Sequence, residues 1–290
     1  MGAQSVAVAI TVFRDPSRLA TLLANMYACG VPDVPIRVFE DPSPHGDREA
    51  ITEGYLNVCK MYNLQLLTAP HWSCMQGIID YALRVTNEDW TIYVPDDVIF
   101  QTGGLQNEYS GILDYGRDFV GGIQAPYWNA DELVKNGVIE SVSDLYNGLG
   151  TLRVPRNSHW DGTGVPRKYI NLNGAGFSIS RRLYDVMGGW PTCTWRLDEW
   201  AGYQAWRHGL VCITLPGPPR IHLGGRGASK IGIQTDFHTV DAWKRATGGL
   251  APEDTARITY SIMDKIKGDD WEAITKYYMC TEPEQLQLWE

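Results

Sequence analysis

Residues 6–26 of the chain are VAVAITVFRDPSRLATLLANM. Residues 6–13 are apolar and rich in β-branched side chains, which is typical of a strand buried on both faces of a sheet. Asp15 is a common residue at a helix start and Pro16 is well accepted in a first turn, so a helix should follow at once. Apolar side chains then recur at helical spacing, at Leu19, Leu22, Leu23 and Met26. The stretch predicts one strand–helix unit of an α/β sheet.

The same alternation continues to about residue 100. Further strands are expected at residues 36–39, 64–68 and 90–94, and further helices at residues 47–62 and 73–85. Strands that alternate with helices predict a mostly parallel sheet flanked by helices. Ligands of such sheets bind beyond the carboxyl ends of the strands. Two acidic pairs, Glu40-Asp41 and Asp96-Asp97, follow predicted strands at that edge.

The second half of the chain is less regular. Residues 103–168 contain many glycines and aromatic residues and are expected to form loops and edge strands around a pocket. Beyond them the patterns predict a strand at 169–180 with a glycine interruption, a strand at 211–215, short helices at 181–187 and 199–208, and a glycine-rich turn at 222–227. No linker is evident. One domain over residues 1–238, followed by a helical C-terminal extension over residues 239–290, is therefore expected.

Composition limits the class of protein. The 290 residues carry 25 Lys and Arg against 34 Asp and Glu, a net charge of −9, which argues against binding nucleic acid by bulk electrostatics but leaves a local basic groove open. The six cysteines are scattered without a CxxC pair, so free thiols in a reducing cytoplasm are expected rather than a zinc site. No apolar run approaches the roughly 18 residues of a membrane span. A cytoplasmic protein without a membrane partner is therefore predicted.

The acidic pairs are the first candidates for chemistry. Adjacent carboxylates such as Asp96 and Asp97 repel each other unless positive charge lies between them, and a divalent cation that also binds a diphosphate would supply it. A polar turn is the alternative. Glu40 and Asp41 could accept hydrogen bonds from a nucleotide base or ribose, or else belong to a loop with a helix cap.

Two later clusters could complete a site. Asp198 and Glu199 lie at the start of a predicted helix, where a carboxylate could act as a general base for an acceptor hydroxyl or could simply cap the helix. Their neighbours Trp195 and Trp200 could stack on an acceptor ring. His222 could complete a metal shell or be structural. The segment after it carries Arg226, which could neutralise a diphosphate leaving group.

Taken in order, these clusters resemble the GT-A fold nucleotide-sugar transferases, and glycosyltransferase family 2 in particular. The similar segments are residues 6–26, FEDPS (39–43), HWSCMQGIIDYAL (71–83), YVPDDVIF (93–100), NGAGFSISRRLYDVMGGW (173–190), LDEWAGYQAWRHG (197–209) and HLGGRG (222–227). They cover roughly residues 5–230. The resemblance implies a Rossmann-like, mixed, mostly parallel sheet, in which residues 1–100 bind the nucleotide-sugar and residues 101–238 bind the acceptor.

The resemblance also implies a role for individual residues. Asp97 and His222 would bind the metal, Asp198 or Glu199 would be the catalytic base, and Trp195, Trp200, Gly174 and Gly176 would face the acceptor. The nucleotide-sugar would be bound by Thr11, Phe13, Arg14, Glu40, Asp41, Gln76, Asp96 and Arg226. The first acid of the family's metal motif is replaced here by Pro95.

The implied activity is a metal-dependent, inverting transfer of a hexose or pentose from a nucleotide-diphosphate donor, a UDP-sugar, to an acceptor hydroxyl, with Mn²⁺ or Mg²⁺ as cofactor. One candidate acceptor is a hydroxymethylated pyrimidine in the DNA of a bacteriophage, and a saccharide or a protein is the alternative. Basic and aromatic residues that could hold phosphates and stack a flipped base, or could simply pack against the protein surface, are interleaved in the second half, at Arg153, Arg156, Arg167, Lys168, Arg181, Arg182, Arg196, Arg207, Trp128 and Trp160.

Two other functions remain open from sequence. A nucleotidyltransferase of related architecture would need a glycine-rich basic loop after the first strand, and residues 13–16 are a poor version of one. A non-catalytic nucleotide-sugar-binding module would not need the acid that Pro95 replaces. The sequence does not predict an oligomeric state.

Overall fold

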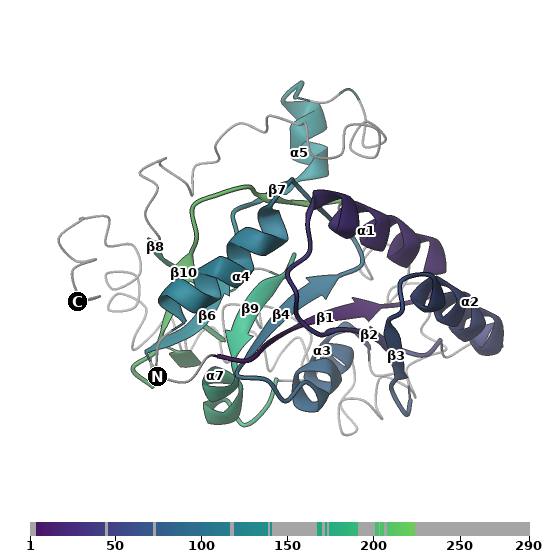
Figure 1. Ribbon diagram of the computed structural model, residues 1–290, viewed down its shortest axis with the longest axis horizontal. Helices are drawn as coiled ribbons and strands as arrows, with labels where there is room; N and C mark the ends of the chain where they lie inside the picture. The colour runs from purple at the N-terminus through teal and green to yellow at the C-terminus, as the bar shows by residue number, and fades with distance from the viewer. Residues whose placement is uncertain are drawn as a thin grey trace, which may run out of the picture.

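The computed structural model describes residues 4–43, 46–71, 74–116, 119–138, 140, 167–169, 172, 174–190, 201–202, 204–205 and 208–223 (Figure 1). Within them, the main sheet contains β1 (Val6–Val12), β2 (Ile36–Glu40), β3 (Gln65–Thr68), β4 (Trp90–Pro95), β6 (Val120–Gln124), β8 (Arg167–Tyr169), β9 (Phe177–Ser180) and β10 (Val211–Thr214). A smaller sheet contains β5 (Val98–Phe100), β7 (Tyr127–Asn129) and β11 (Arg220–His222). The helices are α1 (Pro16–Cys29), α2 (Arg48–Met61), α3 (Cys74–Val85), α4 (Gly104–Tyr115), α5 (Ala130–Lys135) and α7 (Arg181–Val186).

The main sheet is mixed and mostly parallel, as predicted. Its strand order is β3-β2-β1-β4-β9-β6-β10-β8. β1 pairs in parallel with β2 and β4, and β2 with β3, which is the expected result of strand–helix–strand units. β9 runs antiparallel to both β4 and β6, so it reverses the direction of the sheet at its centre. The small sheet pairs β11 with β5 and β7.

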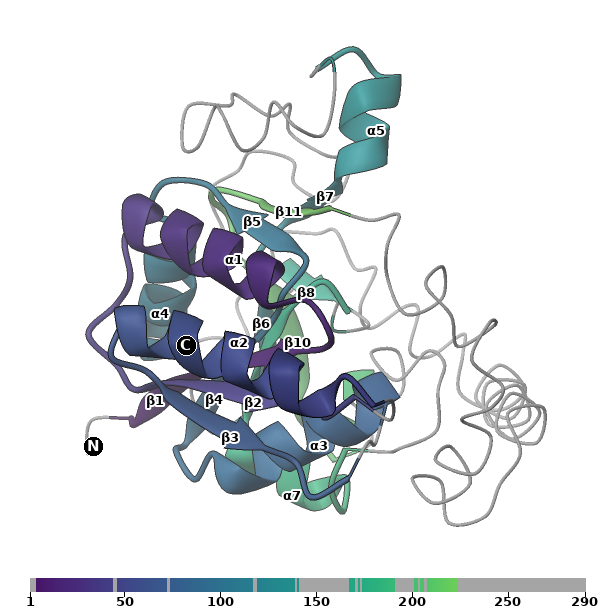
Figure 2. The same cartoon turned by 90° about the vertical axis from the view of Figure 1, so that its right-hand side faces the viewer.

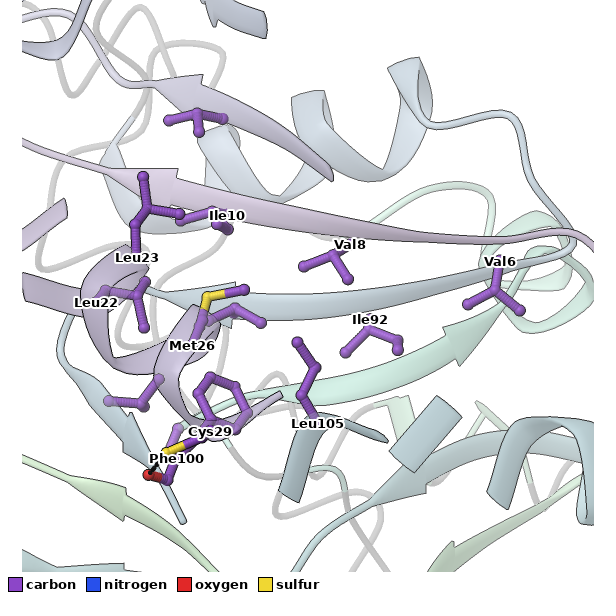
Figure 3. Packing of buried hydrophobic residues seen from close by; sticks show 14 of the residues in the cluster. Val6, Val8, Ile10, Leu22, Leu23, Met26, Cys29, Ile92, Phe100 and Leu105 are labelled. Atoms are coloured by element: carbon purple, nitrogen blue, oxygen red, sulfur yellow. Dashed lines mark hydrogen bonds between the residues drawn. The ribbon is translucent and has the colours of Figure 1, made fainter. Parts of the chain in front are cut away.

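Helices cover both faces of the main sheet. Figure 2 shows α1, α2 and α4 on one side of it and α3 and α7 on the other. Side chains of β1 alternate between these two layers, because Val8 and Ile10 belong to the α1 cluster whereas Ala9 packs with α3. Figure 3 shows the first layer, in which Leu22, Leu23 and Met26 of α1 meet β1. Each such buried leucine contributes roughly 1.5–3 kcal/mol.

The first helix has the predicted cap. Asp15 is the N-cap of α1 and its side chain accepts a hydrogen bond from the backbone N–H of Ser17, while Pro16 occupies the first turn. This fixes the direction in which the chain leaves β1. The helix start is thereby held beside the carboxyl edge of the sheet.

One local expectation was wrong. The region 103–168 was expected to form loops and edge strands, but Leu105 and Ile112 of the helix α4 are buried in the core, and β6 lies inside the main sheet. The glycine interruption expected in the strand at 169–180 is confirmed, because β9 begins only at Phe177, after a turn at Gly174 and a positive φ of 119° at Gly176. The predicted extension over residues 239–290 lies outside the described residues.

Two expectations concern compartment. In the described part of the chain, no helix has the length and apolar character needed to cross a bilayer. Cys29, Cys59 and Cys212 are buried free thiols, in agreement with the prediction for the cysteines that can be described.

Candidate active site

The carboxyl ends of three neighbouring strands bring the predicted nucleotide-binding residues together. In the sheet register, Val12 lies beside Glu40, and Thr11 lies beside Pro95. The segments that continue from these positions carry the predicted site residues Phe13, Arg14, Asp41, Asp96 and Asp97. One edge of the sheet therefore gathers residues that are more than 80 positions apart in the chain.

Asp96 is the most perturbed carboxyl group of this edge. Its Oδ2 atom is buried and has no hydrogen-bond partner, while the backbone N–H of Phe13 donates to the carboxylate. Burial, followed by the neighbouring charge of Asp97, raises the pKa of Asp96 to about 7, although Arg18 and the Phe13 N–H act in the opposite direction. A buried carboxylate oxygen without a donor is costly unless a cation or proton meets it.

Asp97 and His222 are in direct contact. The Nε2 atom of His222 lies 3.1 Å from Oδ2 of Asp97. The small sheet makes this contact, because His222 is paired with Val98 and the N–H of Leu223 donates to the carbonyl of Asp97 at 2.8 Å. Burial lowers the pKa of His222, but the hydrogen bond and charge of Asp97 outweigh it, so this pKa lies above its ordinary value. The side chain of His222 is 30% exposed and that of Asp97 is 13% exposed.

The residues fit a divalent cation in the chemistry of their donors. An imidazole nitrogen and a carboxylate oxygen at this distance can both coordinate one ion. The Asp96 oxygen that has no hydrogen-bond partner adds negative charge nearby. Among the described residues, no group of three or more His, Cys, Asp or Glu side chains is placed to hold a metal. Any cation here would therefore need oxygens from a ligand or from water as well.

Sequence reasoning missed three side chains around this acidic centre. Arg18 on α1 lies 3.6 Å from Asp15 and is close enough to lower the pKa of both Asp96 and His222. The phenol of Tyr55 accepts a hydrogen bond from the N–H of Asp15 at 2.9 Å. Tyr93 accepts one from the Thr11 hydroxyl at 3.2 Å. Burial raises the pKa of both tyrosines, so they remain neutral phenols. Only the place of Arg18, three residues after a helix-capping Asp, could have indicated its proximity.

Glu40 and Asp41 are both buried. The two carboxylate oxygens of Glu40 accept hydrogen bonds from Thr52 of α2 and Thr68 of β3, each at 2.7 Å. These bonds join the end of β2 to its neighbours. The backbone N–H of Asp41 donates to Val12 at 3.0 Å. Glu40 therefore has a packing role in the structure, whereas its contact with a nucleotide stays a prediction.

Arg14 adopts a backbone conformation that is uncommon for a non-glycine residue. Its φ is 59°, and its guanidinium lies 3.3 Å from Asp47 just before α2. Asp47 also accepts a hydrogen bond from Ser43 at 2.6 Å; this bond and then Arg14 lower its pKa. Positive φ values outside glycine are found disproportionately at binding sites. The strained turn after β1 is therefore held against the loop after β2.

The predicted acceptor side is described only in part. Gly174 is exposed in the turn before β9, whereas Gly176 packs against Arg220, as described below. A nitrogen of Arg181 donates to carbonyls of Leu83 and Thr86 at the end of α3, so this residue of the predicted basic groove also caps a helix. Asp198, Glu199, Trp195, Trp200 and Arg226 lie outside the described residues. The backbone of Gln76 belongs to α3, but its side chain is likewise outside them.

Comparisons with known proteins find similar folds among solved structures. No protein-family model matches the sequence, and no curated protein matches it. A mannosyltransferase from Pyrobaculum calidifontis, in complex with GDP-Man and Mn²⁺, is structurally similar with a TM-score of 0.56 and 17% identity, over 99% of this chain and 79% of that one. GalNAc-T7 with UDP, GalNAc and Mn²⁺ is similar with a TM-score of 0.56 and 11% identity, over 96% of this chain and 58% of that one.

A third similar structure is TarS from S. aureus, with a TM-score of 0.52 and 11% identity, over 98% of this chain and 77% of the solved one. At these identities the likeness concerns the fold. The chain has the GT-A fold.

Proposed function

We propose that the protein is a glycosyltransferase that moves a sugar from a nucleotide-diphosphate donor, a UDP-sugar, to an acceptor hydroxyl. The observation that carries the proposal is the contact between Asp97 and His222 beside the unpartnered oxygen of Asp96, at the carboxyl edge of the sheet. Two proteins of the same fold were solved with a sugar nucleotide, or a nucleotide and a sugar, together with Mn²⁺. That shared architecture supports a donor site at this edge.

In this proposal Asp97 and His222 would hold Mn²⁺ or Mg²⁺ next to the diphosphate of the donor. The ion would neutralise the charge that develops on the departing nucleotide diphosphate. Arg18 adds a fixed positive charge next to the same place, since its field already lowers the pKa values of Asp96 and His222. Thr11, Phe13, Arg14, Glu40, Asp41, Gln76 and Arg226 are proposed to surround the nucleotide.

The acceptor half of the proposal rests on sequence. Asp198 or Glu199 would take the proton of the attacking hydroxyl, which leads to direct displacement with inversion at the anomeric carbon. Trp195 and Trp200 would stack on the acceptor, beside the turn that contains Gly174. The interleaved arginines and tryptophans favour DNA carrying a hydroxymethylated pyrimidine as acceptor.

Donor cleavage tests the transferase. Incubation with a panel of UDP-sugars and Mn²⁺ is expected to release UDP, and EDTA should stop the release. Because only one carboxylate can be the base, either Asp198→Asn or Glu199→Gln should lower turnover about a hundredfold or more, and the other should have a small effect. Nucleotide binding without release from any donor would favour the non-catalytic module. If neither substitution slows turnover, the base lies elsewhere.

A separate experiment identifies the acceptor. We expect mass spectrometry to detect a hexose- or pentose-sized gain on hydroxymethylated DNA, and none on unmodified DNA, simple saccharides or peptides. Unmodified DNA is the matched control, because it offers the same phosphates and bases without the attacking hydroxyl. A gain on saccharide or peptide alone would refute the DNA acceptor and leave the transferase activity intact.

A further inference from the structure

A buried ion pair is formed by a residue of β11, the strand that carries the proposed cation ligand His222. Arg220 of β11 and Glu108 of α4 are 1% and 0% exposed. Nε of Arg220 donates to Oε1 of Glu108 at 2.6 Å, and Nη2 donates to Oε2, so the contact is bidentate. The remaining nitrogen, Nη1, donates to the backbone carbonyl of Tyr93 at 3.0 Å. One guanidinium thus joins β11, α4 and β4.

The surroundings are fitted to this guanidinium. Gly176 has no side chain at the point where a Cβ would overlap Nη1 and come within 2.8 Å of Cζ. The Phe100 ring faces the guanidinium at 5.1 Å, and the Ser178 hydroxyl lies 3.4 Å from Glu108. Desolvating both charges is expensive, and an apolar pair of similar volume often stabilises a core as well or better. Stability alone is therefore a poor explanation for the pair.

The position of the pair suggests another explanation. On β11, Arg220 is followed after one residue by His222, and on β4 the Tyr93 carbonyl is followed closely by Asp96 and Asp97. β11 belongs to the small sheet and β4 to the main sheet. Among the described residues, the backbone hydrogen bonds of β11 go to β5, β7 and Pro126, and Leu223 directly after it bonds to Asp97. The guanidinium links the backbone that carries His222 to β4, the strand that leads into the turn with Asp97.

We propose that the Glu108–Arg220 pair is a positioning element that sets His222 against Asp97. This inference rests on the proposed function, in which these two side chains bind the cation. A guanidinium fork fixes both distance and angle, whereas an ammonium group fixes neither. Metal ligands tolerate displacements of only about 0.2 Å, so a small shift of β11 would weaken binding without unfolding the protein. Gly176 contributes by leaving room for the fork.

Three variants test the pair, and one control accounts for lost stability. Arg220→Lys keeps the charge but loses the fork, and the double change Arg220→Met with Glu108→Leu replaces the pair by apolar side chains of similar volume. Leu83→Ala, in the core cluster on the other face of the sheet, is the control for lost stability. Gly176→Ala should act like Arg220→Lys, because the new Cβ displaces the guanidinium.

Two readouts apply to the whole protein. Ring-nitrogen NMR of His222 in metal-free protein reports its hydrogen bond to Asp97, and the EPR signal of free Mn²⁺, in the presence of UDP, reports cation binding. We expect the Arg220 and Gly176 variants to lose the hydrogen-bonded His222 signature and to bind Mn²⁺ about tenfold or more weakly. Leu83→Ala should lower the unfolding temperature and change neither readout.

The outcomes separate the two proposals. Variants that fold and keep the wild-type His222 signature, or keep wild-type Mn²⁺ affinity, overturn the positioning role. If wild-type protein binds no Mn²⁺ with UDP, the proposed function fails, and the positioning of a cation site fails with it. The His222 signature then still shows whether the pair orients this histidine at all. If the double variant does not fold, Arg220→Lys decides whether the pair has the positioning role, because it retains a buried charge pair.

Discussion

Asp97→Asn is expected to lower the rate of donor cleavage at least about a hundredfold and to weaken Mn²⁺ binding in parallel. The substitution keeps the size of the side chain but removes the charge that faces Nε2 of His222 at 3.1 Å. An amide oxygen is a much poorer partner for a divalent cation than a carboxylate, and electrostatic stabilisation of a leaving group is commonly worth two to three orders of magnitude in rate. The measurement is turnover against Mn²⁺ concentration with the preferred UDP-sugar.

The matched control is Asp131→Asn. Asp131 lies at the start of α5 and its charge also raises the pKa of His222, but the side chain is exposed. Removing it takes one carboxylate from the same neighbourhood without removing a proposed ligand, so turnover should change less than about twofold. If Asp97→Asn keeps full Mn²⁺-dependent turnover, the assignment of this residue to the cation is wrong.

The part of the fold that could be predicted depends on local patterns. Residues 6–29 predict a strand and a helix because a continuous apolar run is followed by apolar residues at helical spacing, and the structure confirms β1 and α1 there. The helix α4 was missed because its apolar residues are few: Leu105 and Ile112 are separated by polar residues and a glycine. Its burial comes from partners far away in the chain, which no local pattern records.

The candidate site shows the same limit. A resemblance in the order of motifs suggested that Asp97 and His222 share a cation, and the structure brings them together across 125 residues. The resemblance does not indicate that Glu40 is hydrogen-bonded to two threonines, or that Arg220 and Glu108 form a buried pair 112 residues apart. Gly176 shows why. The resemblance placed it near the acceptor, whereas the structure shows that it makes room for a guanidinium. The acceptor role of this glycine stays a prediction.

The second large effect concerns stability. Asp96→Asn is expected to stabilise the metal-free protein at pH 8, because the folded chain raises the pKa of Asp96 from 3.8 to about 7. Between these values the unfolded chain releases this proton and the folded chain keeps it. The free energy of unfolding therefore falls as the pH rises from about 4 to about 7, and the full penalty remains above that. At about 1.4 kcal/mol per pH unit the penalty is of the order of 4 kcal/mol, which asparagine does not incur.

Urea unfolding of both proteins between pH 4 and pH 8, in EDTA, measures this difference. Wild type and Asp96→Asn should be similarly stable near pH 4 and diverge as the pH rises; parallel profiles would show that Asp96 ionises freely in the folded state. Addition of Mn²⁺ and UDP should stabilise the wild type more than the variant at pH 8, because a cation compensates a charge that only the wild type carries. Turnover should fall about tenfold or more in Asp96→Asn. A residue that destabilises the resting protein and is needed for activity is expected of a functional site, whereas a merely structural carboxylate directly after β4 would give the stability difference without the loss of turnover.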